Sequence, residues 1–213
     1  MPGTFGLLLT WGGDFMRIIN VKRAIIILLM IGIMVIISGC ARWPDEPGPE
    51  PGETEYQLKI TVEVAGNINS GLDNDGIYYI VFDADSDSTD GPSDDLNFWE
   101  DDYYYIMLDG TGFYFAQVKD GFESYFSGGS ITGTNKFQIT IAISDLGDPV
   151  PTSIGINVVT TDLDGYTYDS LNDYFSIRTE LNQTGEGFSS TGLKEEEADF
   201  DIVEAKAVIT TLY

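Results

Sequence analysis

Two segments of the chain alternate strictly between apolar and polar residues. In residues 136–144, which read KFQITIAIS, every second side chain from Phe137 onward is a large apolar one. Residues 57–64, QLKITVEV, repeat the pattern from Leu58. A period of two places successive side chains on opposite faces of an extended strand, so both segments are predicted to be half-buried β-strands.

Further strands are predicted by runs of aromatic and β-branched residues between turn-forming Asp-Gly and Gly-Gly pairs. These strands are residues 76–84, 102–110, 112–120, 153–161 and 200–212. Helical periodicity is absent from this part of the sequence, apart from one short turn predicted over residues 192–198. Many short strands at this spacing predict an all-β domain over residues 56–213, an antiparallel β-sandwich of immunoglobulin-like or jelly-roll-like type.

The N-terminal region has a different pattern. Residues 24–37 are 14 consecutive residues without a charge, AIIILLMIGIMVII, preceded by Arg17, Lys22 and Arg23. A basic segment, an apolar run of this length and small residues after it are typical of a secretory signal peptide. Residues 1–39 are therefore predicted to be a signal peptide. Translation is expected to begin at Met16, because Asp14 precedes the basic cluster.

Cys40, the one cysteine of the chain, follows directly in the sequence IISGC. This sequence resembles the lipobox of bacterial lipoproteins. The resemblance implies cleavage before Cys40, lipid (palmitate) attachment to it, and a protein anchored to the cell envelope on its extracytoplasmic side. Ala41 would favour the outer membrane where there is one. Residues 40–55, rich in proline and acid, are then a spacer. The alternative is an uncleaved membrane anchor with an incidental cysteine.

The charge of the mature chain limits its partners. Residues 1–39 hold three of the 10 basic and one of the 35 acidic residues, which leaves 7 bases and 34 acids and a net charge of −27. Nucleic acid binding needs lysine and arginine to neutralise phosphates, and anionic lipid surfaces attract basic segments. Both are excluded as partners, whereas neutral glycans, cations and metal ions remain.

Three motifs in the domain resemble a known family. IYYIVFDAD, FQITIAISDLGDP and SIGINVVTTDLDG, within residues 73–173, are similar to segments of family 9 carbohydrate-binding modules and related DOMON-like sandwiches. The resemblance implies a β-sandwich that binds the ends of sugar chains, often with structural calcium. That family holds sugars between two tryptophans, but Trp99 is the one tryptophan of the predicted domain.

Clustered aspartates predict calcium sites, because calcium takes six to eight hard oxygen ligands. The first candidate is DADSDSTDGPSDD, with Asp83, Asp85, Asp87 and Asp90 as ligands and Asp94 and Asp95 nearby. The second is DLDGYTYD, with Asp162, Asp164 and Asp169, and the third is LDNDG, with Asp73, Asn74 and Asp75. The alternative is a set of hydrated turns.

Aromatic residues are dense in NFWEDDYYYIMLDGTGFYF. Alternation places Tyr103 and Tyr105 on one face of a strand and Tyr104 on the other. One hypothesis is an aromatic surface that stacks on sugar rings, formed by Trp99, Tyr103, Tyr105 and Tyr114. The alternative is that these rings fill the core and form cross-strand pairs.

Catalysis is not expected. The chain has no histidine, which excludes imidazole acid–base chemistry and histidine-ligated zinc. Acylation of Cys40 would also remove its thiolate. The sequence therefore predicts a surface-anchored lipoprotein carrying a non-catalytic binding module for carbohydrate, with a calcium-stabilised loop. The alternative is a structural or adhesive envelope lipoprotein that binds another protein.

Overall fold

The computed structural model of the chain describes residues 55–73, 76–87, 89–193 and 195–211. The predicted signal peptide, Cys40 and nearly all of the predicted tether lie outside the described residues. Asn74 and Asp75 of the third calcium candidate lie outside them as well.

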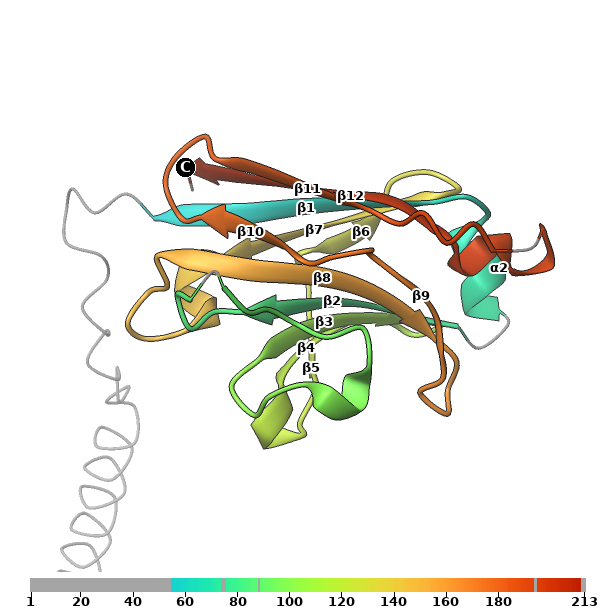
Figure 1. The fold of residues 1–213 in the computed structure, drawn as a ribbon, viewed down its shortest axis with the longest axis horizontal. Helices are drawn as coiled ribbons and strands as arrows, with labels where there is room; N and C mark the ends of the chain where they lie inside the picture. Colours follow the sequence, from blue (N-terminus) through green and yellow to red (C-terminus); the bar gives the residue numbers. More distant parts are fainter. Residues whose placement is uncertain (1–54, 74–75, 88, 194, 212–213) are drawn as a thin grey trace, which may run out of the picture. The chain divides into compact units, whose positions relative to one another are not determined.

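The described chain folds into two antiparallel sheets that face each other (Figure 1). One sheet has five strands in the order β11 (Thr184–Phe188), β12 (Ile202–Thr211), β1 (Tyr56–Val64), β7 (Lys136–Ala142) and β6 (Gly129–Ile131). The other has β10 (Phe175–Arg178), β8 (Ser153–Thr161), β2 (Ile77–Asp83), β3 (Tyr104–Asp109), β4 (Gly112–Gln117) and β5 (Ser124–Tyr125), with β9 (Thr167–Ser170) also paired to β8. The prediction of an all-β sandwich is confirmed.

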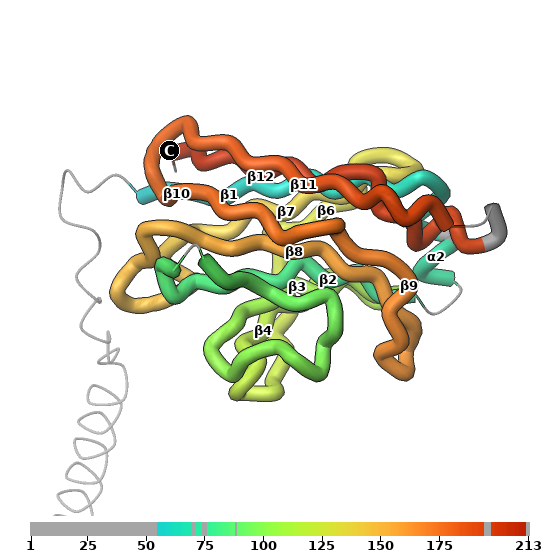
Figure 2. The backbone as a smooth tube through the Cα atoms, in the orientation of Figure 1, coloured from blue at the N-terminus to red at the C-terminus, as the bar shows by residue number. Residues whose placement is uncertain are grey.

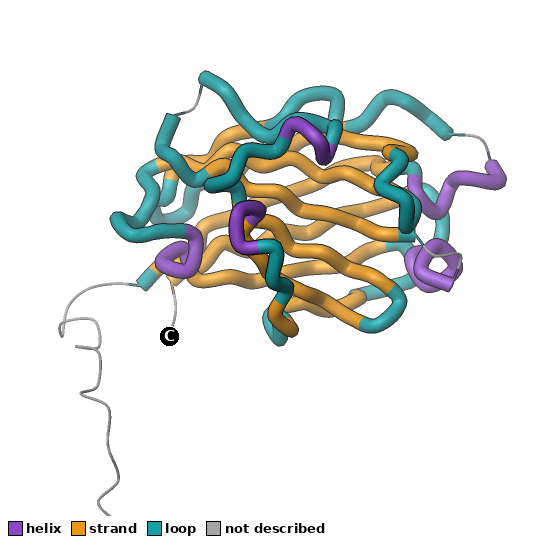
Figure 3. The backbone as a smooth tube through the Cα atoms, turned by 90° about the horizontal axis from the view of Figure 1, so that it is seen from below, coloured by secondary structure: helices purple, strands orange, loops and turns teal. Residues whose placement is uncertain are grey.

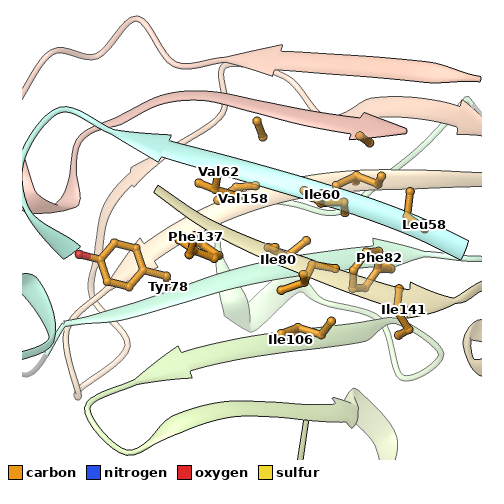
Figure 4. Close-up of a cluster of buried hydrophobic side chains, with 14 of the residues drawn as sticks. Leu58, Ile60, Val62, Tyr78, Ile80, Phe82, Ile106, Phe137, Ile141 and Val158 are labelled. Atoms are coloured by element: carbon orange, nitrogen blue, oxygen red, sulfur yellow. The ribbon is translucent and has the colours of Figure 1, made fainter. Parts of the chain in front are cut away.

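The core lies between the sheets and follows from the alternation. Leu58, Ile60 and Val62 of β1 are completely buried, while Lys59 and Thr61 between them are only partly so. Figure 4 shows these side chains meeting residues of the opposite sheet, among them Ile80 and Phe82 of β2. Removing so much apolar surface from water is the main stabilising contribution to a fold that has no disulfide among its described residues.

Among the described residues, helical structure is limited to short pieces: α2 (Ile68–Asp73), η1 (Leu96–Phe98), η2 (Val118–Asp120), η3 (Ile143–Leu146) and η4 (Glu195–Phe200). Of these, η4 overlaps the predicted turn at 192–198, and the others were not predicted. Figure 1 shows α2 at one end of the sandwich, away from the start of β1. There the hydroxyl of Tyr78 donates to the backbone oxygen of Asp199 at 2.8 Å, which ties η4 to the core.

The outer face of the seven-stranded sheet is partly covered by the long connection between β2 and β3, residues 84–103. Val81 and Asp83 point outward from β2, yet they are only 0% and 3% exposed. Figure 2 shows the path of this connection in green, and Figure 3, seen from below, shows loops and short helical turns lying over part of the strands. This acidic loop brings the candidate functional residues together.

Candidate functional site

The acidic loop, residues 84–103, is held on the sheet by a hydrogen bond from β8 and by the packing of Trp99. Asn157 of β8 donates from Nδ2 to the backbone oxygen of Pro92 at 2.9 Å. Within the loop, the Trp99 indole nitrogen donates to the backbone oxygen of Ser93, also at 2.9 Å. The Trp99 ring then packs edge-on against Tyr79 of β2, with 5.5 Å between ring centroids. Trp99 therefore fixes the loop to the sheet and is itself part of the exposed surface.

Three aspartates meet where β2 passes into this loop. Asp83, Asp85 and Asp90 each place a carboxylate oxygen within 4.8 Å of the others. Asp83 is 3% exposed, and the other two are exposed. The backbone N–H of Asp85 donates to the Asp83 carboxylate at 3.2 Å. Burial, together with the charges of Asp85, Asp90 and Asp102, raises the pKa of Asp83 to about 6.

This arrangement suits a hard cation. Each carboxylate offers one or two oxygens, and calcium in proteins takes its remaining ligands from backbone carbonyls and water. Repulsion between ionised carboxylates this close costs about 1–4 kcal/mol per pair at the effective dielectric of water to protein surface. A divalent ion would remove that repulsion. Among the described residues no other group of three or more acids converges in this way.

Asp87, predicted as a fourth ligand, does not join this group. Its carboxylate accepts from the backbone N–H of Thr89 at 2.9 Å and from the hydroxyl of the same residue at 2.8 Å. These are the contacts of a local turn. In the sequence Asp87 follows Asp83 and Asp85 at alternate positions, which predicted that it would be a ligand with them. In the structure the local turn directs its carboxylate to Thr89.

The second predicted calcium cluster is separated by the fold. One carboxylate oxygen of Asp162 accepts from the backbone N–H groups of Asp164 and Tyr166, at 2.9 and 2.8 Å, and so shapes the β8–β9 turn. Asp169 is 3% exposed and points inward, where it accepts from Ile202 N–H at 2.8 Å and the Ser189 hydroxyl at 2.9 Å. Asp164 is exposed. Asp162, Asp164 and Asp169 therefore do not come together in the structure as the predicted calcium site requires.

Aromatic side chains gather on the outer face of β2, β3, β4 and β5. Cross-strand pairing aligns Tyr79, Met107, Tyr114 and Tyr125 in one row across the four strands. Tyr105 lies in the next row and contacts Tyr79 and Trp99, each with 5.9 Å between centroids. The rings of Tyr114 and Tyr125 meet edge-on at 6.2 Å. We call Tyr79, Trp99, Tyr105, Tyr114 and Tyr125 the aromatic face.

The hydroxyl groups on the aromatic face have polar partners. Tyr105 donates to the Glu123 carboxylate at 3.1 Å, and the Tyr114 and Thr111 hydroxyls lie 2.8 Å apart. Burial raises the pKa of Tyr79 to about 12 and also raises the pKa of Tyr105. Both phenols are therefore neutral at physiological pH and act as hydrogen-bonding aromatic surfaces, not as acid–base groups.

Three of the four predicted ligand-binding residues, Trp99, Tyr105 and Tyr114, belong to this face. Tyr103 does not, because only 6% of it is exposed. This burial, together with the charge of Asp83, raises the pKa of Tyr103. Tyr79 and Tyr125 were missed. Tyr125 is 73% exposed, in a two-residue strand that has too few positions to show alternation.

A separate groove of about 570 Å³ lies on the outer face of the five-stranded sheet. It is lined by Lys59, Thr61, Glu186 and Lys206 among others, and no aromatic side chain lines it. The ammonium of Lys206 is paired with Glu204 at 2.6 Å. The converging aspartates and the aromatic rings lie on the opposite sheet, and we place the candidate site there.

Comparison with protein-family models gives no match for this chain, and comparison with curated proteins and with solved structures gives none either. Within the described residues there is no helix long and apolar enough to cross a membrane. The apolar run at residues 24–37 lies outside them. The functional argument therefore depends on the geometry of the acidic loop and the aromatic face.

Proposed function

We propose that this protein is a lipid-anchored component of the cell envelope whose β-sandwich binds glycans without catalysis. The observation that carries the proposal is the aromatic face. The inner side chains of the seven-stranded sheet already fill the core, so its outer face would ordinarily be polar. Instead, five aromatic side chains lie on that face with hydrogen-bonding groups around them.

An aromatic face of this kind is suited to sugars. The apolar faces of pyranose rings pack on aromatic rings, and hydroxyl groups at their edges require hydrogen-bonding partners such as Glu123 and Thr111. Adjacent strands are about 4.8 Å apart, so the row from Tyr79 to Tyr125 extends over several strand spacings. A linear glycan laid along this row would contact the rings of Tyr114 and Tyr125 on adjacent strands and that of Tyr79 beyond the buried Met107. The net charge of −27 expected after removal of residues 1–39 favours a neutral glycan over an anionic one.

The test is binding of soluble neutral polysaccharides to the detergent-solubilised lipoprotein, measured by affinity electrophoresis. Losing one stacked ring removes about 0.5–1.5 kcal/mol, which corresponds to about 2- to 12-fold weaker binding. We expect Tyr125→Ala to have this effect. Tyr166→Ala is the matched control, because Tyr166 is equally exposed at 73% but lies on the β8–β9 turn.

Two results would contradict the proposal. One is that no polysaccharide retards the wild-type protein, and the other is that both tyrosine variants lose the same affinity. In the second case the loss would reflect general surface chemistry and not the aromatic face.

A second candidate function is adhesion to another protein. It is favoured by two exposed phenylalanines, Phe98 at the end of η1 and Phe122 between η2 and β5, which are 71% and 86% exposed. Large exposed aromatic residues are enriched at protein interfaces. Loss of self-association or of partner capture in a Phe98→Ser, Phe122→Ser double variant, with glycan binding absent, would favour this candidate.

The lipid anchor is tested at Cys40. Cys40→Ser should prevent acylation, because serine has no thiol, and should leave the precursor unprocessed or release the protein. We expect its membrane-bound fraction to fall, and its partition into the detergent phase of Triton X-114 to change. Mass spectrometry of the N-terminal peptide reports acylation directly. Unchanged partitioning together with an unchanged mature mass would rule out the lipobox.

A further inference from the structure

A cleft of about 440 Å³ lies beside the acidic loop, on the side where that loop meets β8, β9 and β10. Its walls come from three separate parts of the chain: residues 91–94 of the loop, Asn157 of β8, and residues 170–174, with Thr191 at its edge. Sites for small ligands are typically about 300–1,000 Å³. The cleft is therefore of suitable size for a small ligand, and it is distinct from the aromatic face.

The walls of the cleft are fixed by specific contacts. Gly91 lies against the Tyr174 ring so closely that a Cβ there would be 2.4 Å from a ring carbon. Only glycine permits that approach. Asn157 binds the backbone of Pro92, as described above, and the Asn172 side-chain oxygen accepts from the backbone and hydroxyl of Ser190 at 3.1 and 2.9 Å. A cleft held from three sides in this way is largely formed before a ligand arrives, which reduces the entropy lost on binding.

The chemistry of the lining excludes several classes of ligand. None of the lining residues is a lysine or arginine, and Asp94 and Asp173 are among them. Anionic ligands are therefore disfavoured. Leu171 and Pro92 are the main apolar contributors, and the rest of the lining is dominated by polar groups. An apolar ligand would leave those groups without hydrogen bonds, which is costly.

The mixture of donors and acceptors matches sugar hydroxyl groups. The Asn172 amide and the Thr191 hydroxyl can donate to a ligand, and the carboxylates of Asp94 and Asp173 can only accept when ionised. The side chains of Asn157, Ser93 and Ser170 already donate within the protein, to Pro92, Asp94 and Leu171. A cation would use the acceptors and leave the donors unmatched. A sugar hydroxyl both donates and accepts, and the Tyr174 ring adds an aromatic surface.

We propose that this cleft is a second carbohydrate subsite, which holds a single neutral sugar residue. The inference rests on the proposed glycan-binding function, but it concerns different residues. The cleft and the aromatic face are connected through Ser93 of the acidic loop. Ser93 lines the cleft, while its backbone oxygen accepts the Trp99 hydrogen bond on the side of the aromatic face.

The inference can be tested with simple sugars on the mature lipoprotein, in a detergent without a sugar headgroup. Saturation-transfer difference NMR is recorded with glucose, galactose, mannose, xylose and N-acetylglucosamine and with their common disaccharides. Thr191→Trp places a large ring at the cleft mouth, and Thr191 is exposed, so the fold should tolerate it. Thr184→Trp on β11 is the matched control, because this threonine is also exposed. Asp173→Ala removes one exposed acceptor at the rim and serves as the second cleft variant.

We expect at least one of these sugars to bind, and Thr191→Trp to weaken its binding by 10-fold or more. Asp173→Ala should weaken binding by several-fold, and Thr184→Trp should leave it unchanged. The cleft subsite is overturned if no small sugar binds, or if the bound sugar is lost in Tyr125→Ala and retained in Thr191→Trp. Retardation by polysaccharides is measured in parallel, so a failed cleft with intact retardation leaves the proposed function standing. If neither small sugars nor polysaccharides bind the wild-type protein, the cleft subsite and the proposed function are both overturned.

Discussion

Addition of Ca²⁺ to the metal-free protein at pH 7.5 is expected to raise its thermal unfolding midpoint by about 5–10 °C. An ion that binds only the folded state stabilises it by RT ln(1 + [L]/Kd), about 2.7 kcal/mol when free ion is 100-fold above Kd. For a domain of this size, each kcal/mol shifts the midpoint by about 2–4 °C. The expectation follows from the convergence of Asp83, Asp85 and Asp90.

The loop supplies a matched pair of variants for this experiment. Asp85→Asn should abolish the calcium-specific shift, whereas Asp87→Asn, with the same change in charge two residues away, should retain most of it. The reason is that Asp87 lies outside the group of converging carboxylates and binds Thr89 instead. Sodium chloride at matched ionic strength is the control for screening of exposed acids. Magnesium is the control for ion size, because its rigid octahedral shell suits such a loop poorly.

The calcium effect should also depend on pH. In the metal-free protein the pKa of Asp83 is raised from 3.8 to about 6, so between about pH 4 and 6 the folded state binds a proton more tightly than the unfolded chain. The free energy of unfolding should therefore decrease as pH rises through that window. The full shift of about two pKa units corresponds to about 3 kcal/mol, which solvent screening at the open loop should reduce to about 1–2 kcal/mol.

Calcium competes with this proton, so its stabilising effect should be large at pH 7.5 and nearly absent at pH 5. Differential scanning calorimetry at both pH values measures the difference. If calcium raises the midpoint no more than matched sodium chloride does, or if Asp85→Asn and Asp87→Asn respond alike, the three aspartates are not a calcium site.

Asp169→Ala should be more damaging than any substitution of an exposed acid, with a loss of about 3 kcal/mol in the free energy of unfolding. Hydrogen bonds to a charged group contribute about 1.5–3 kcal/mol, and a buried donor left without a partner costs about 1–3 kcal/mol. The substitution leaves the N–H of Ile202, a residue only 1% exposed, without its acceptor. It also removes the shorter of the two hydrogen bonds that the Ser189 hydroxyl makes to side chains.

Chemical denaturation monitored by circular dichroism measures this loss, and Asp164→Ala is the control. Asp164 lies on the same β8–β9 connection, is exposed, and carries the same charge. We expect its substitution to change stability by less than about 0.5 kcal/mol, and the effect of Asp169→Ala to persist without calcium. Equal effects of the two variants would show that Asp169 does not anchor β9 to β12.

Much of the fold could be predicted because the long strands carry their own pattern. In β7, Phe137, Ile139 and Ile141 are buried, and Gln138 and Thr140 between them are not. Seven of the twelve strands in the described residues lie in predicted segments, two predicted from alternation and five from aromatic and β-branched runs between turn residues. In β1 and β7 the alternation is a local property, because a strand with one face in the core must alternate whatever its neighbours are.

The remaining strands, β5, β6, β9, β10 and β11, have two to five residues each. Segments so short contain no full pattern, and they become strands because a longer neighbour supplies hydrogen-bonding partners. β11 is an example. Its sequence TGEGF has two glycines, which disfavour strands, yet it pairs with β12 over five residues. Its conformation is set by a contact that is distant in sequence.

The sequence by itself determined that a β-sandwich would form, that acids and aromatics would be concentrated between residues 83 and 115, and that histidine chemistry was excluded. It could not distinguish among similar residues. Asp83, Asp87 and Asp169 look alike in the sequence, but the first joins a converging group, the second caps a turn and the third is a buried anchor. Tyr103 and Tyr105 share an alternating pattern, yet only Tyr105 joins the aromatic face, because Tyr103, the last residue of the acidic loop, is buried near Asp83. The direction and burial of a side chain depend on which distant segment packs against it, and only the tertiary structure decides that.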